Sequence, residues 1–208
     1  TMEKQAAYVL HSRPYRETSA MVDFFTPDFG LIRCIARGIK KQMSQGQSLQ
    51  PFTEYQIFFH GDSDLKTLDQ YECNSLPLSI EREGLKGDAL FSGFYLNEVL
   101  QRALRSEADI ESELLFEAYQ IALASLNKAN LELSLRQFEL TLLEHMGQAY
   151  EWALDFRTGV EVDASAHYGF YAEQGMSRVG MAHVKSNPRA CFKGCDLKSL
   201  SQGELLQP

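Results

Sequence analysis

The first third of the chain alternates between apolar and polar residues in short runs, a pattern that predicts β-strands. In the run at 31–37, Ile32, Cys34 and Ala36 fall on one side, and the residues between them fall on the other. Such runs, bounded by Pro, Asp and Gly turn residues, occur at 6–11, 21–26, 31–37, 52–60 and 65–71. Five strands in about 70 residues predict a small closed or nearly closed barrel.

After Pro77 the apolar spacing changes to that of amphipathic helices, in segments at 88–105, 110–127 and 131–147. From Asp155 onward the sequence is irregular and rich in Gly, Ser and His, with a further helix starting at 196. We therefore expect an α+β multidomain chain. It has a barrel domain over 1–78, a helical domain over 79–150 and a small irregular C-terminal module over 151–208.

Charge is distributed unevenly between these parts. The chain has a formal net charge of -8, yet residues 1–60 hold seven basic and five acidic residues, whereas 61–208 hold 13 basic and 23 acidic. The segment 29–53 has four cations and no Asp or Glu. This asymmetry indicates an anionic partner for the basic part, such as nucleic acid. The alternative is an ordinary solvated face of cations.

Several function classes lack their sequence signals. There is no run of 18 apolar residues for a membrane span, no phosphate-binding ATP loop and no serine or zinc hydrolase motif. With no secretory segment we expect a cytoplasmic protein with reduced thiols. Cys191 and Cys195 resemble half of a zinc site, but His167 and His183 do not complete it at a usual spacing. We expect no enzyme activity, no metal and no cofactor.

A set of colinear segments covers nearly the whole chain. They are Ala7-Tyr-Val-Leu-His-Ser-Arg-Pro-Tyr-Arg-Glu-Thr-Ser19, Thr26-Pro-Asp-Phe-Gly30, Ala36-Arg-Gly38, Leu49-Gln-Pro-Phe-Thr53, Tyr95-Leu-Asn-Glu98 and Arg136-Gln-Phe-Glu-Leu140. No single segment is decisive, but together they resemble the bacterial RecO family of recombination mediators.

The resemblance implies an N-terminal OB-fold barrel, a helical middle and a small C-terminal module, without enzymatic turnover. It implies binding to single- and double-stranded DNA, annealing of complementary strands, and loading of RecA together with RecR. It also implies docking on the acidic C-terminal tail of single-stranded DNA-binding protein, and association with the nucleoid.

An OB barrel binds DNA with cations for the phosphates and aromatic rings for the bases. We expect Arg33 and Arg37 to share one strand face, and Lys40 and Lys41 to lie in the loop that follows this strand. Arg13 and Arg16 are expected in the connection between the first two strands. Together these six cations would form one rim of the barrel.

For the partner tail, we expect a helical groove with a cation. Arg136 matches the family's arginine at this place, and Arg102 with Phe138 is a second candidate pair. The alternative for Arg136 is a surface arginine near a helix start.

The chain departs from the family pattern in its C-terminal module. Many relatives carry four zinc-binding cysteines there, whereas this chain has Phe156-Arg-Thr-Gly159, so we expect a zinc-free module stabilised by packing. Relatives also extend beyond the position that matches Pro208. A rival hypothesis is a protein-interaction adaptor whose helices recruit partners while the barrel is a scaffold. A hydrolase is disfavoured by the missing motifs.

Overall fold

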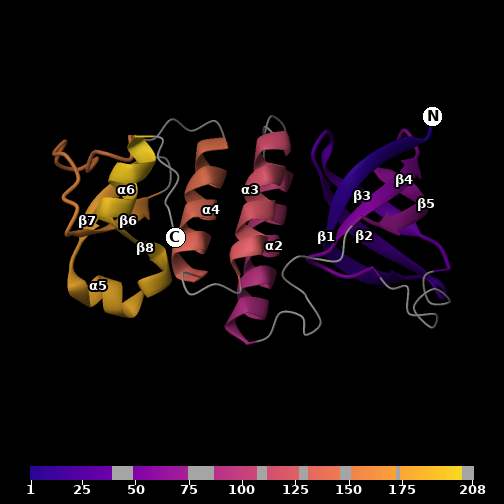
Figure 1. Cartoon of the computed structure of the whole chain (residues 1–208), viewed down its shortest axis with the longest axis horizontal. Helices are drawn as coiled ribbons and strands as arrows, with labels where there is room; N and C mark the ends of the chain where they lie inside the picture. Colours follow the sequence, from indigo (N-terminus) through magenta and orange to yellow (C-terminus); the bar gives the residue numbers. More distant parts are fainter. Residues whose placement is uncertain are drawn as a thin grey trace. The chain divides into compact units, whose positions relative to one another are not determined.

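The alternating runs form five strands, which close into a barrel in the order β1-β2-β3-β5-β4 (Figure 1). The strands are β1 Glu3–Tyr15, β2 Ser19–Thr26, β3 Gly30–Ala36, β4 Glu54–His60 and β5 Leu65–Cys73. Neighbouring strands pair antiparallel except for β3 and β5, which are parallel. The expected five-stranded OB barrel is therefore confirmed.

The computed structural model describes residues 1–38, 49–74, 87–106, 112–126, 131–145, 151–171 and 174–202. The expected boundary between barrel and helices, at 78, lies outside these residues, as do Lys40 and Lys41. By its internal contacts the chain divides into two units, Thr1–Met146 and Gly147–Pro208. Across the described residues, no helix is both long enough and apolar enough to span a membrane.

The alternation of β1, β2 and β3 fills the barrel interior with apolar side chains from every second residue. Ala7, Val22, Phe24, Ile32 and Cys34 are buried there. The residues between them therefore point out of the barrel.

Among its described residues, the first unit also contains three helices: α2 Asp88–Ser106, α3 Ser112–Ser125 and α4 Leu131–His145 (Figure 1). They share a core with outward-facing residues of the barrel. The ring of Tyr8 on β1 lies 5.1 Å from that of Tyr119 and 5.4 Å from that of Phe116 on α3. Aromatic packing therefore holds the barrel and the helices together. Each ring pair contributes about 0.5–1.5 kcal/mol beyond the stabilisation from the apolar area it buries.

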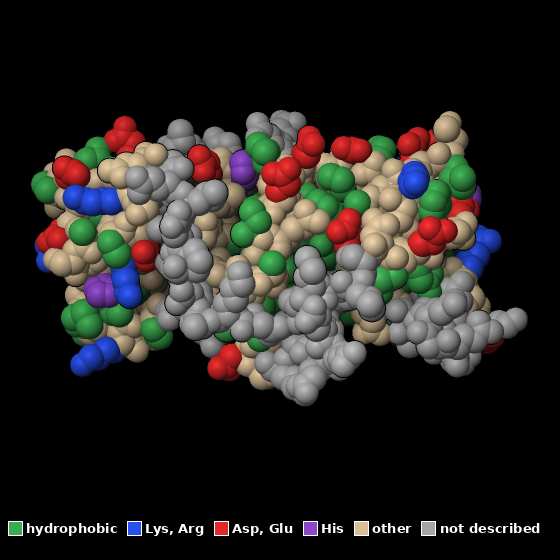
Figure 2. Space-filling model, in the orientation of Figure 1, with side chains coloured by type: hydrophobic (Ala, Val, Ile, Leu, Met, Phe, Trp, Pro, Cys, Tyr) green, Lys and Arg blue, Asp and Glu red, His purple; other side chains and the backbone are tan. Residues whose placement is uncertain are grey.

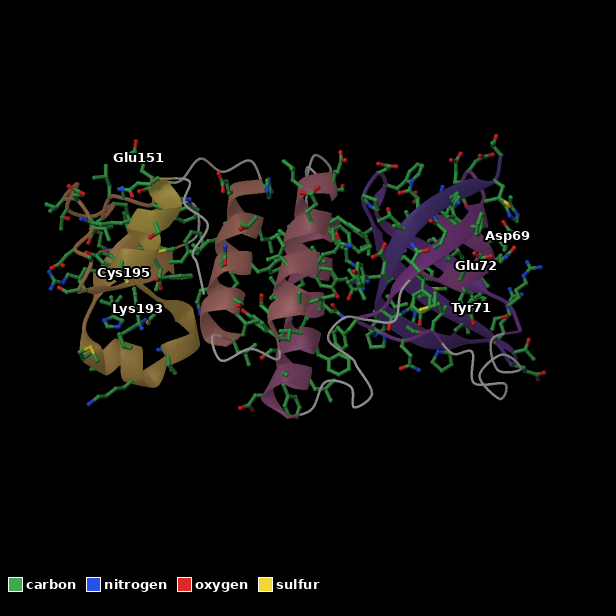
Figure 3. The ribbon with its side chains drawn as sticks, viewed as in Figure 1. Asp69, Tyr71, Glu72, Glu151, Lys193 and Cys195 are labelled. Carbon is green, nitrogen blue, oxygen red and sulfur yellow. The ribbon has the colours of Figure 1, made fainter. Side chains whose placement is uncertain are left out.

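The second unit contains a three-stranded sheet in the order β7-β6-β8. Its elements are β6 His167–Tyr171, β7 Gly175–Val179, α5 Met181–Ser186, η1 Pro188–Ala190, β8 Cys191–Lys193 and α6 Gly194–Ser201. The expected C-terminal module is present but is more regular than its sequence indicated. Lys193 and Cys195 flank Gly194, where β8 passes into α6 (Figure 3). A Cβ at Gly194 would lie 1.9 Å from the carbonyl oxygen of Asp163, so this junction requires glycine.

Candidate nucleic-acid interface

The outer face of β1, β2 and β3 carries Arg13 and Arg33, two of the six cations expected to bind DNA. In the strand register, His11 pairs with Asp23, which pairs with Arg33 on β3. In the adjacent row, Arg13 pairs with Met21. Residues in direct register lie on the same face of a sheet, so both arginines belong to one outer surface, which we call the β1–β3 face.

Arg33 is not a fully independent cation, because it pairs with Asp23. Its Nε donates to Asp23 Oδ1 at 2.6 Å and its terminal nitrogen donates to Oδ2 at 3.2 Å. Burial alone would raise the pKa of Asp23, but the hydrogen bonds and charge of Arg33 hold that pKa below its usual value. The same pair raises the pKa of Arg33, which therefore stays charged.

Two residues from α2 complete this arrangement. Gln101 Nε2 donates to Asp23 Oδ2 at 2.6 Å, and a terminal nitrogen of Arg105 donates to the same oxygen at 3.2 Å. We call Asp23, Arg33, Gln101 and Arg105 the Asp23 cluster. Sequence reasoning missed the two α2 residues, since they lie 78 and 82 positions from Asp23 and only the folded packing brings them together.

The other described cations expected to bind DNA are Arg13, Arg16 and Arg37, which lie outside the Asp23 cluster. Arg13 is exposed and donates to the sulfur of Met21 at 3.0 Å. Arg16, in the turn after β1, has a positive φ of 55° and its guanidinium lies 5.1 Å from the centre of the Tyr15 ring. Arg37 follows β3 and is exposed.

Acidic side chains occupy other parts of the barrel. Asp69 and Glu72 are exposed on β5, on the side of the barrel away from the helices (Figure 3). In the view of Figure 2, acidic and basic side chains are interspersed over the first unit, with no continuous positive surface. Of the described cations expected to bind DNA, the β1–β3 face holds Arg13 and Arg33.

Comparison with known proteins identifies the family. A family model described as "Recombination protein O N terminal" matches residues 2–76, and one described as "Recombination protein O C terminal" matches residues 85–191. The chain belongs to the RecO family. Similar curated proteins include the DNA repair protein RecO of Idiomarina loihiensis, 38% identical over 199 residues, covering 95% of this chain and 81% of that protein. The DNA repair protein RecO of Pseudomonas putida is 39% identical over 202 residues, covering 96% and 82%. A role in DNA repair and recombination follows from this membership.

The residues expected to hold a partner tail in this RecO-family chain lie on the helices, but not all are at the surface. Arg136 is buried in α4 rather than exposed near a helix start. It donates to Glu139 at 2.7 Å, and the hydroxyl of Tyr95 donates to the other oxygen of Glu139 at 2.6 Å. The alternative of a surface arginine is therefore wrong. Arg102 is exposed and pairs with Glu98 one turn earlier at 2.5 Å.

Phe138 requires a correction. Only 2% of it is exposed, and its ring lies 6.3 Å from that of Tyr119 in the helical core. Such a side chain stabilises the unit and cannot contact a partner directly. Phe91, Phe94 and Tyr95 on α2 are exposed aromatic residues, and the sequence pattern did not connect them with a partner.

The C-terminal unit does not fit the zinc site of RecO relatives. In 151–171 and 174–202, as elsewhere in the described chain, no group of three His, Cys, Asp or Glu side chains is arranged to hold a metal ion. The turn at 155–159 is organised by the carboxylate of Asp155, which accepts hydrogen bonds from the backbone N–H groups of Arg157 at 2.9 Å and Arg178 at 2.8 Å. This carboxylate organises the turn through backbone donors and belongs to no such group of metal-binding side chains.

Proposed function

We propose that this chain is a non-catalytic recombination mediator that binds single- and double-stranded DNA through the β1–β3 face and anneals complementary strands. The observation that carries the proposal is the placement of Arg13 and Arg33 on one outer face of an OB barrel. Arg16 and Arg37 add exposed cations next to that face. Phosphate neutralisation by several arginines gives sequence-independent binding, and annealing requires only that two strands be held with reduced repulsion.

The test is a fluorescence-anisotropy titration of a labelled oligonucleotide over a range of salt concentrations. Arg13→Glu with Arg37→Glu is expected to weaken binding and to lower the salt slope by roughly 1.4, or roughly 0.7 for each lost phosphate contact on a single strand. Lys4→Glu is the matched control. Lys4 is an exposed cation of the same barrel, but it pairs with β4, beside the Phe58 ring, away from the β1–β3 face.

Lys40 and Lys41, which lie outside the described residues, belong to the same proposal as cations that follow β3 in the sequence. Their exchange for Glu is expected to flatten the salt slope further. Unchanged affinity and slope in both double variants would favour the adaptor, in which the barrel is only a scaffold. The adaptor gains support from the pairing of Arg33 with Asp23 and from the exposed aromatic side chains of α2.

We propose further that the helices bind the acidic tail of single-stranded DNA-binding protein. We also propose that the chain acts with RecR to load RecA, as a cytoplasmic protein associated with the nucleoid. The tail needs a cation beside apolar surface. Arg102 on α2 supplies an exposed cation, and Phe94 and Tyr95 supply exposed rings. The buried Arg136 lies behind Tyr95, since both donate to Glu139.

Because Arg136 is buried against Glu139, Arg136→Ala alone would leave a buried carboxylate without its cation. The sharper variant is Arg136→Ala with Glu139→Gln, which removes both charges. Loss of tail-peptide capture with naked-DNA binding intact is expected. Retained capture would show that Arg136 is not the tail's cation.

A further inference from the structure

The Asp23 cluster contains more positive charge than it needs to hold α2 against the barrel. One carboxylate faces two guanidinium groups, since Arg33 contacts both oxygens of Asp23 and Arg105 contacts one of them. Within the residues that the structure describes, Asp23 is the one acidic side chain that pairs with either arginine. After pairing, the cluster therefore retains about one unit of positive charge.

The exposure of the side chains shows on which side this charge lies. The Asp23 side chain is 4% exposed, whereas those of Arg33 and Arg105 are 37% and 52% exposed. The carboxylate thus lies beneath the two guanidinium groups, which meet the solvent. A guanidinium has five N–H donors, and the contacts to Asp23 use two from Arg33 and one from Arg105.

A purely structural role explains Arg105 poorly. Gln101 already joins α2 to Asp23 with a neutral hydrogen bond of 2.6 Å, and Arg33 already balances the carboxylate through two contacts. The partial negative charge at the C-terminal end of α2, equivalent to about half a unit, stabilises Arg105 there but does not cancel a full guanidinium charge.

We infer that Arg105 and Arg33 form a phosphate-binding pair, through which a bound DNA strand passes from the β1–β3 face onto the last turn of α2. Asp23 acts as a positioning residue that holds the two guanidinium groups side by side. This inference rests on the proposed DNA binding and deepens it, because it makes the helical part a direct contributor to the DNA surface. The recognised chemistry is the phosphodiester backbone, which planar guanidinium groups bind with two parallel hydrogen bonds.

The experiment compares Arg105→Ala with Lys4→Ala in anisotropy titrations of single-stranded DNA at several salt concentrations. Lys4 is the control, since it is an exposed cation on the part of β1 that pairs with β4. Arg105→Ala is expected to lower the salt slope by roughly 0.7, so that a variant equal to the unmodified chain at 1 M salt binds about fivefold more weakly than that chain at 0.1 M. Lys4→Ala is expected to leave affinity and slope unchanged, and Arg105→Lys to restore the slope.

The possible failures are distinguishable. If Arg105→Ala weakens binding without changing the slope, Arg105 only holds the helix in place and the inference is wrong. If the Arg13 and Arg37 variants lower the slope but Arg105→Ala does not, the inference fails while the proposed function stands. If the unmodified chain shows no salt-dependent binding, the proposed function itself fails.

Discussion

Replacement of Asp155 is expected to unfold the C-terminal unit selectively. The Asp155 carboxylate is buried and accepts backbone N–H groups from two separate segments, Arg157 in its own turn and Arg178 on β7. The turn is closed by a bond from the Gly159 N–H to the Asp155 carbonyl at 2.8 Å, with Gly159 at a φ of +67°. One side chain therefore ties the turn at 155–159 to the sheet.

The cost follows from these two contacts. A buried donor left unsatisfied costs about 1–3 kcal/mol, so Asp155→Ala, which orphans two N–H groups, should destabilise the unit by about 2–6 kcal/mol. With an m-value of about 1 kcal/mol/M, the lower bound alone shifts the urea midpoint by about 2 M. Asp155→Asn keeps one acceptor oxygen and should cost about 1–3 kcal/mol, which keeps the effect measurable if the alanine variant does not fold.

The chain offers a specific probe for this measurement. Trp152 is the one tryptophan in the sequence, and it is buried within the same unit. Its fluorescence during urea unfolding therefore reports on this unit. Asp163→Ala is the control, because Asp163 is an exposed aspartate whose carboxylate accepts hydrogen bonds from Ser165, two residues away, and its loss should give a much smaller shift. Equal midpoints for Asp155→Ala and the unmodified chain would refute the reasoning.

Asp155 also makes the stability of the C-terminal unit depend on pH. Burial alone would raise the pKa of Asp155, but the backbone hydrogen bonds from Arg178 and Arg157 lower it on balance. A carboxyl group whose pKa is lowered by folding contributes stability above its unfolded value, near 3.9. That contribution is lost as the pH falls through the folded value. The tryptophan-detected stability should therefore decline below about pH 4, and less steeply in Asp155→Asn. Equally steep declines would assign the acid sensitivity to other groups.

Two further perturbations test the packing. Burial raises the pKa of the Cys34 thiol to about 12, so this thiol should react slowly with iodoacetamide at pH 8. Mass spectrometry of the treated native protein should find the label on exposed Cys73 and Cys195 and not on Cys34. Rapid labelling of Cys34 would contradict its place inside the barrel. Phe138→Ala should destabilise the first unit by about 3–5 kcal/mol, as measured by thermal melting followed by circular dichroism. Phe91→Ala, at a position 72% exposed, should have little effect, and similar melting losses for both would remove the case for Phe138 as a core residue.

The strands of the barrel could be predicted because each places every second side chain in a shared interior. Their ends were less predictable. The sequence pattern ended the first strand at 11, but β1 extends to Tyr15, since its second half pairs with β2 while facing solvent and needs no apolar residues there. Pro14 is tolerated because it lies near the end of the β1–β2 pairing. In the C-terminal unit, strands of three to five residues are too short to show alternation.

The candidate site was predictable only in part, because charge alone does not show which cations are already paired. The sequence placed Arg33 on an outer strand face correctly, but its contact with Asp23 depends on strand register, and that of Arg105 on helix packing. Likewise, the sequence of α4 gave no signal that Arg136 is buried. Long-range pairing of this kind has no local pattern.

The two buried aspartates illustrate why the units should respond differently to mutation. Asp155 accepts hydrogen bonds from backbone N–H groups, which side-chain substitutions at Arg157 and Arg178 do not remove. Loss of the Asp155 carboxylate should therefore lower the stability of the C-terminal unit. Asp23 accepts only side-chain donors in its described contacts, and each of these can be changed singly while the others hold the carboxylate. Removing Arg105 leaves Arg33 and Gln101 in place, so the barrel and α2 should stay joined while the surface loses one charge. We therefore expect Arg105→Ala to weaken DNA binding without a change in melting temperature.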